Sequence, residues 1–150
     1  MGFFDIFKST SSKFKKEVQR FSSMDTLEAF IGANLLMCVA ETKTAPTKEN
    51  ISDVSTRVKA TPCVQQYKHS DIDEIIQKYT SMFKNAGYGT AKLEVQRILE
   101  VISEERRDAE NVIKAVISEA ERDGNISPNE EQMLEWIGDQ LRLDPANYID

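Results

Sequence analysis

The chain has 150 residues, 40% of them hydrophobic and 29% charged, which suits one globular domain with a substantial core. Its net charge of −6 argues against a surface built to bind nucleic acid. The single histidine, His69, leaves no material for histidine-dependent metal sites or catalytic triads. No stretch approaches the roughly 18 apolar residues of a membrane span. Because the N-terminus also lacks the pattern of a secretory signal peptide, we expect a cytoplasmic protein.

The N-terminal segment, residues 1–22, is basic and aromatic, and its first 20 residues hold five Lys or Arg against two acids. Two interpretations remain open for it. In the first, its aromatic side chains dock on the core. In the second, the segment binds an anionic membrane surface, where burial of the aromatic side chains and attraction of the lysines to anionic lipid both favour binding. The second interpretation would place the protein peripherally at the inner membrane. The residues expected to make these contacts are Phe3, Phe4, Phe7, Lys13, Lys15 and Lys16.

Residues 23–150 form the main domain, in which apolar side chains recur at helical spacing in six segments. These run from Asp25 to about Glu41, Pro46 to about Lys59, Ser70 to Phe83, Thr90 to Ser103, Ala109 to Arg122, and Pro128 to about Leu141. The broad apolar stripe of the first predicts a central helix, and Leu93 is expected to face inward in the fourth. With a basic N-terminal helix and no convincing strand, this pattern predicts an all-α fold, a single compact domain of about seven helices.

Acidic residues collect at a turn between the last two of these segments. Gly124 can take the positive φ that ends a helix, and Ser127, Pro128 and Glu130 form the signal of a new helix with a capping box. Residues 101–150 hold thirteen acids against five Lys or Arg. The turn is therefore the most acidic feature with a defined local geometry.

These acids admit two interpretations. Glu130 caps its own helix and the others are solvated, or their oxygens converge on a hard cation such as Ca²⁺, which takes six to eight oxygen ligands. The residues Glu119, Glu121, Asp123, Gly124, Ile126 and Glu130 match positions 1, 3, 5, 6, 8 and 12 of a calcium loop. Glu119 stands where Asp is usual, and its longer side chain fits that position poorly. We therefore expect weak binding of Ca²⁺ or another divalent metal.

An internal echo relates two parts of the chain. The stretches LMCVAETKTAPTKENISDV and VISEAERDGNISPNEEQML share an apolar helix, a short turn and a second apolar helix. Glu49 is expected at the place that Glu130 takes in the second copy, which makes Glu49 a further candidate metal ligand. Lys43 stands where the second copy has Asp123. The echo predicts two pseudo-repeated helical halves, each built on a helix hairpin.

Nearly the whole chain resembles the TerB family of tellurite-resistance proteins. The resemblance is carried by MGFFDIFK, SDIDEIIQKY, AERDGNISPNEE and LRLDPANY, with Asp123, Gly124 and Glu130 as its most characteristic element. It implies a compact all-helical fold of two related halves. It also implies a cytoplasmic protein that works with other tellurite-resistance and stress-response components, some of them membrane-bound, and an acidic cluster for a divalent metal. Lys43 and Thr44 replace the family's Asp and Gly in the first half, which weakens the case for a two-sided metal site.

The sequence shows no arrangement typical of an enzyme. No glycine-rich phosphate loop follows a strand, and the many acids have no paired electrophile or metal. Cys38 and Cys63 lie in apolar surroundings and make no metal-site spacing. Three functions remain: a metal-responsive stress protein acting through partners, a helical interaction or co-chaperone-type module with no metal role, and a calcium sensor that opens a groove.

Overall fold

The computed structural model describes residues 20–148, apart from the side chain of Asp123. The contacts expected for Phe3, Phe4, Phe7, Lys13, Lys15 and Lys16 fall outside the described residues. Within the described part, the chain is helical and contains no strand. Its α-helices are α2 (Met24–Cys38), α3 (Lys48–Ala60), α4 (His69–Ala86), α5 (Tyr88–Ser103), α6 (Arg106–Ala120) and α7 (Pro128–Leu141). Three 3₁₀ turns accompany them, η2 (Pro62–Val64), η3 (Glu121–Asp123) and η4 (Pro145–Tyr148). The expected all-α class is confirmed.

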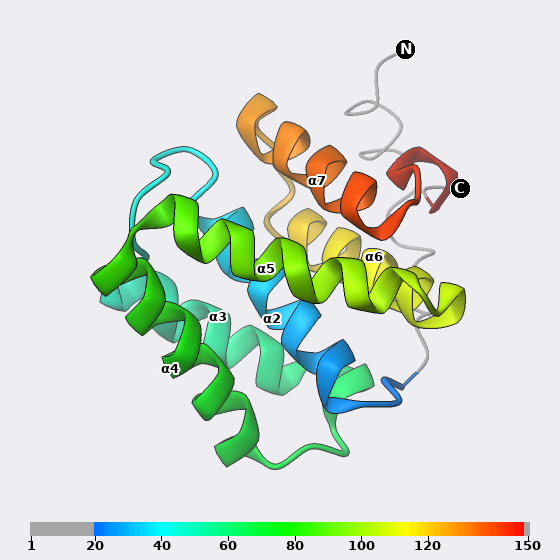
Figure 1. Cartoon of the computed structure of the whole chain (residues 1–150), viewed down its shortest axis with the longest axis horizontal. Helices are drawn as coiled ribbons and strands as arrows, with labels where there is room; N and C mark the ends of the chain where they lie inside the picture. Colours follow the sequence, from blue (N-terminus) through cyan, green and yellow to red (C-terminus); the bar gives the residue numbers. More distant parts are fainter. Residues whose placement is uncertain (1–19, 149–150) are drawn as a thin grey trace.

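Helix α2 is the centre of the domain. It packs against α3, α4, α5, α6 and α7, and in Figure 1 it lies between the α3–α4 pair and the α6–α7 pair, with α5 running across it. Leu27, Phe30, Ile31 and Leu35 have no exposed surface. Because apolar residues surround its axis, the helix gains stability from burial on every side rather than along one stripe.

The crossing of α2 and α5 depends on a glycine. A Cβ atom added at Gly32 would lie 3.0 Å from a methyl carbon of Val95 on α5. The missing side chain therefore lets the two helices approach closely. A larger residue at Gly32 would require the Val95 side chain to shift, because packed interiors have little free volume.

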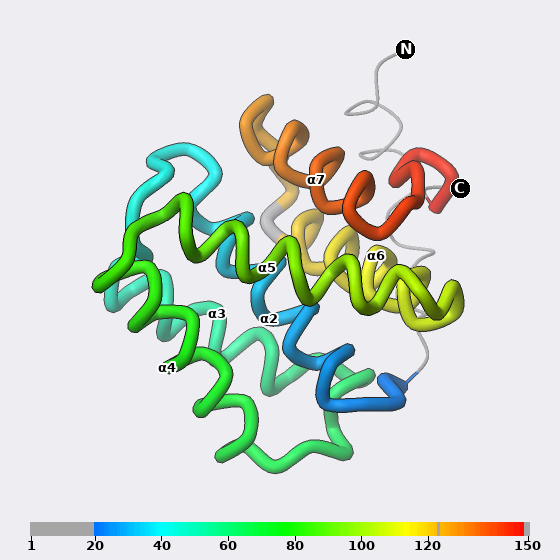
Figure 2. The backbone as a smooth tube through the Cα atoms, viewed as in Figure 1, coloured from blue at the N-terminus to red at the C-terminus, as the bar shows by residue number. Residues whose placement is uncertain are grey.

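Two helix hairpins, α2–α3 and α6–α7, correspond to the two copies of the internal echo, and their connecting turns can be followed in Figure 2. The second helix of each hairpin opens with a capping box, formed by Thr47 with Asn50 in α3 and by Ser127 with Glu130 in α7. Asn50, and not Glu49, therefore occupies the place equivalent to Glu130. The expected equivalence of Glu49 and Glu130 was displaced by one residue, because matching acids by charge ignores which residue bonds back to the cap.

Helix boundaries differ from the predicted ones where tertiary contacts or backbone caps decide them. Helix α2 is capped by Ser23 rather than Asp25, because the Ser23 hydroxyl accepts from the backbone N–H of Thr26. Helix α5 begins at Tyr88, directly after Gly87, which takes a φ of 94°. Leu93 was expected to face the core but is 66% exposed, because the buried stripe of α5 follows Ala91, Val95 and Ile98 instead.

Candidate functional site

The acidic turn is a tight link between α6 and α7. Helix α6 ends at Ala120, η3 follows, and Gly124 closes the link with a φ of 77°. Ser127 then caps α7, since its hydroxyl accepts from the Glu130 N–H at 3.1 Å and Glu130 Oε1 accepts from the Ser127 N–H at 3.1 Å. Ile126 is 4% exposed and holds the turn against the core. The predicted stop signal, cap and capping box are all present.

A polar cavity of about 270 Å³ lies where the turns of the two hairpins meet. It brings together oxygen-bearing residues from both halves of the chain. The first hairpin supplies α2, the turn after it and α3, and the second supplies the end of α6 and the start of α7. The polar residues that line it are Asn34, Glu41, Asn50, Asp53, Arg57, Glu119 and Glu130.

Glu41 joins the two hairpins across this cavity. Its carboxylate accepts a hydrogen bond from Ser127 Oγ and another from Asn129 Nδ2, the latter 2.7 Å long. The hydrogen bonds from Ser127 and Asn129 lower the pKa of Glu41. Glu41 was not among the site residues predicted from the sequence. The echo contained the signal for it, since Ala40-Glu41 in the first copy stands where Ala120-Glu121 stands in the second.

Glu119 is buried in an ion-pair network. Its side chain is 4% exposed, and its Oε1 accepts from Thr61 Oγ1 at 3.1 Å and from Arg122 Nη2 at 3.2 Å. Arg57 Nη1 lies 3.6 Å from Oε2. Two guanidinium groups therefore already balance this carboxylate, which makes it a poorer ligand for an incoming cation than a carboxylate with only neutral partners.

The structure does not bring all of the other predicted site residues into the polar cavity. Glu49 is exposed on the first turn of α3, and neither Glu49 nor Glu121 lines the polar cavity. The side chain of Asp123 is outside the described residues. Among the side chains that the structure does describe, no group of three or more His, Cys, Asp or Glu is arranged to hold a metal ion.

Both cysteines are protonated thiols at neutral pH. Burial raises the pKa of Cys38 to about 12 and that of Cys63 to about 12. The Cys38 thiol also donates to the Leu35 carbonyl at 3.1 Å. Because the thiolate is the reactive form, these values agree with the interpretation that neither cysteine carries out thiol chemistry.

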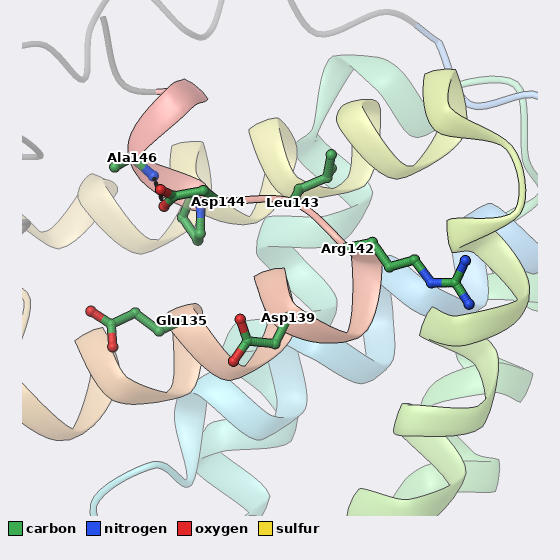
Figure 3. A pocket seen from close by; sticks show the side chains of 7 residues that line it. Glu135, Asp139, Arg142, Leu143, Asp144 and Ala146 are labelled. Carbon is green, nitrogen blue, oxygen red and sulfur yellow. Dashed lines mark hydrogen bonds between the residues drawn. The ribbon is translucent and has the colours of Figure 1, made fainter.

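A larger cavity of about 510 Å³ lies at the other end of α7, beside η4. Figure 3 shows Glu135, Asp139 and Asp144 along it, with the Arg142 side chain directed away from Glu135 and Asp139. Asp144 Oδ1 accepts from the Ala146 N–H at 3.0 Å, so this acid stabilises the turn into η4. The cavity contains no residue of the acidic turn.

Residues 32–150 match the sequence model of a protein family described as tellurite resistance protein TerB. The match covers the C-terminal half of α2 and all of α3 to α7, including the acidic turn and every residue that lines the polar cavity. No curated protein and no solved structure matches this chain significantly.

Proposed function

The chain belongs to the TerB family of tellurite-resistance proteins, and we propose that it binds a divalent cation weakly between its two hairpins and acts through partner proteins. Family membership supports a role related to tellurite resistance. The family consists of non-catalytic helical domains, and we propose that this chain is likewise no enzyme.

The observation that carries the proposal is that Glu41 and Glu130 line one polar cavity from opposite halves of the chain. Carboxylate and amide oxygens are the ligands that Ca²⁺ and Mg²⁺ prefer. Asn50, Asp53 and Asn34 supply further oxygens on the same cavity. A cation held there would contact both hairpins, as Glu41 does through Ser127 and Asn129.

The expected affinity is low for two structural reasons. Asp53 is committed to Arg57, whose Nε lies 3.0 Å from Asp53 Oδ2, and Glu119 is balanced by two arginines. A cation would therefore rely on Glu41, Glu130, amide oxygens and water, too few charged ligands for a tight site. Lys43 is not among the lining residues, so its ammonium does not fill the cavity.

Titration with CaCl₂ or MgCl₂, followed by backbone amide NMR shifts, tests this proposal. We expect shifts at residues 41, 50 and 127–130 at millimolar concentrations. Glu130→Gln keeps the acceptor of the capping box and removes a charge, whereas Glu41→Gln removes a charge and keeps only one of two acceptor oxygens. Each should weaken binding by about tenfold. Glu49→Gln is the matched control, because Glu49 is equally acidic, starts the same helix as Asn50 and lies outside the cavity.

If Glu49→Gln weakens cation binding as much as Glu130→Gln, an acid outside the cavity contributes equally, and the cavity is not the binding site. If no amide in either turn shifts with either ion, Glu130 is only a capping residue and the cation proposal is wrong.

A second candidate is a helical interaction module of co-chaperone type with no metal role. It is favoured by two apolar side chains on α5 that face solvent, Leu93 and Val101, which are 66% and 44% exposed. None of the helices among residues 20–148 is long and apolar enough to span a membrane. The basic and aromatic composition of residues 1–22 supports peripheral contact with an anionic membrane, and sedimentation with anionic vesicles that is lost at high salt would test it.

A further inference from the structure

The polar cavity between the two hairpins contains a cation of its own. Its lining includes one arginine, Arg57, whose side chain is 17% exposed. The described residues that line it also include four acids, Glu41, Asp53, Glu119 and Glu130. The fold therefore supplies one positive charge to a cavity wall that carries four negative ones.

Arg57 contacts two of these acids, and they come from different hairpins. Its Nε atom lies 3.0 Å from Asp53 Oδ2, one turn earlier on α3. Its Nη1 atom lies 3.6 Å from Glu119 Oε2 on α6. A guanidinium holds its N–H donors in a rigid planar fork, so one group can face two carboxylates. Arg57 thus links α3 to α6 with a single charge that the two acids share.

The two contacts of Arg57 differ in quality. Its bond to Asp53 has a normal length, whereas 3.6 Å to Glu119 is longer than a hydrogen bond. Glu119 Oε2 is buried without a hydrogen-bond partner, while Oε1 accepts from Thr61 and Arg122. A buried carboxylate oxygen without a donor is unfavourable. The contact between Arg57 and Glu119 therefore depends on charge alone and is the weaker of the two.

This arrangement makes Arg57 a competitor of any cation that enters the cavity. The guanidinium and a divalent cation repel each other and are attracted by the same carboxylates. Asp53 and Glu119 are therefore withheld from the cation as long as Arg57 faces them. On the basis of the cation site proposed above, we infer that Arg57 sets the cation affinity of this cavity by competing for Asp53 and Glu119.

Titration of Arg57→Gln with CaCl₂, followed by backbone amide NMR shifts, tests this inference. The variant should bind Ca²⁺ about tenfold more tightly than the unsubstituted protein, because two carboxylates become available. Arg97→Gln is the matched control, since Arg97 pairs with Glu94 at 2.7 Å and lies outside the cavity. A purely structural Arg57 would lower the unfolding temperature of the variant without changing the affinity. That result, or an equal gain in Arg97→Gln, would overturn the inference.

A second variant identifies the carboxylate that Arg57 withholds. Asp53→Asn alone should not tighten Ca²⁺ binding, because Asp53 is engaged by Arg57 in the unsubstituted protein. Asp53→Asn combined with Arg57→Gln should lose much of the tenfold gain, because the released carboxylate is then absent. A double variant that binds as tightly as Arg57→Gln would contradict the competition.

The unsubstituted protein provides a further test, which matters because loss of Arg57 leaves the buried Glu119 with one arginine fewer. The side-chain Nε–H signal of Arg57 should shift at the same CaCl₂ concentrations as the amides of residues 127–130, and that of Arg97 should not. KCl at equal ionic strength controls for screening.

The outcomes separate this inference from the cation site itself. A constant Arg57 signal while the amides shift would overturn the inference and leave the cation site intact. Binding by Arg57→Gln alone, with no shift in the unsubstituted protein, would support the inference and overturn the proposed function. If neither protein binds, both are wrong.

Discussion

The two hairpin turns of this protein are built on the same plan but end their first helices differently. After α6, Gly124 takes a φ of 77°, a conformation that glycine adopts without strain. After α2, the residue with positive φ is Lys43, at 54°. Both turns lead into a capping box, with Asn50 in the first and Glu130 in the second. The first turn therefore keeps the geometry of the second while its backbone is strained and its capping residue is uncharged.

This difference shows which part of the repeat the fold requires. Cap geometry is retained in both halves because each second helix must satisfy its first N–H groups. The acidic glycine-containing turn is retained in one half only, so it is not required for the hairpin to form.

The largest expected effect comes from the residue that pins the second turn. Ile126→Ala removes a side chain that is 4% exposed and should lower the free energy of unfolding by about 2–5 kcal/mol, because a cavity remains. Pro46→Ala, at the corresponding place in the first turn, should cost much less because Pro46 is only half-buried. Urea denaturation followed by helical circular dichroism measures both. Equal losses would mean that both turns are anchored alike.

Substitutions at the two positive-φ residues of the hairpin turns, Gly124 and Lys43, should change the stability of the fold in opposite directions. Gly124→Ala should destabilise by about 1–2 kcal/mol, because alanine disfavours positive φ and no atom lies near enough to change the packing. Lys43→Gly should stabilise by up to about 1 kcal/mol by relieving the same strain, less the entropy of glycine in the unfolded chain. Thermal unfolding of the two variants decides this. A destabilised Lys43→Gly would indicate that the lysine side chain makes a stabilising contact.

The two N-caps should differ because only one of them reaches the other hairpin. Thr47→Ala removes a cap worth about 1 kcal/mol. Ser127→Ala removes a comparable cap and also the hydroxyl that donates to Glu41, so it should destabilise more than Thr47→Ala. A double-mutant cycle of Ser127→Ala with Glu41→Ala isolates the second part, because alanine leaves no acceptor for the Ser127 hydroxyl. Additive losses would show that the link between Glu41 and Ser127 contributes nothing.

The smallest expected effect is a pH dependence of that link. Since the pKa of Glu41 is lower in the folded protein, its contribution is complete above the unfolded-state pKa and is lost as the pH falls through the folded-state pKa. Glu41→Gln should therefore lower stability slightly at neutral pH, and its difference from the unsubstituted protein should vanish as the pH falls through the folded-state pKa of Glu41. Glu49→Gln is the comparison, and a matching change in that variant would remove the special role of Glu41.

Much of the site was predictable because it is encoded in local sequence. Gly124, Ser127, Pro128 and Glu130 act within one turn of each other, so their spacing alone predicted the stop, the cap and the capping box. Glu41 was missed because its partners, Ser127 and Asn129, are more than 80 residues away in the chain. Such a contact leaves no helical periodicity in the sequence, and only the alignment of Glu41 with Glu121 in the internal echo pointed to it.

Local patterns also misled where a tertiary contact outweighed them. Leu93 has the right residue type and spacing for a buried position, yet the stripe chosen by α5 is the one that places Val95 against Gly32. Glu119 was expected to serve a cation, but Arg57 reaches it from α3 and Arg122 from η3. In both cases the deciding atom belongs to another element.

The sequence by itself determined the helical class, the order of the helices, the two hairpins and the caps, because these depend on interactions between residues a few positions apart. Only the tertiary structure decided which acids share a cavity, which acid is neutralised by arginines, and that Asn50 rather than Glu49 matches Glu130. Those outcomes depend on how α2, α3, α6 and α7 pack, since burial and distance set the charge balance that each carboxylate experiences.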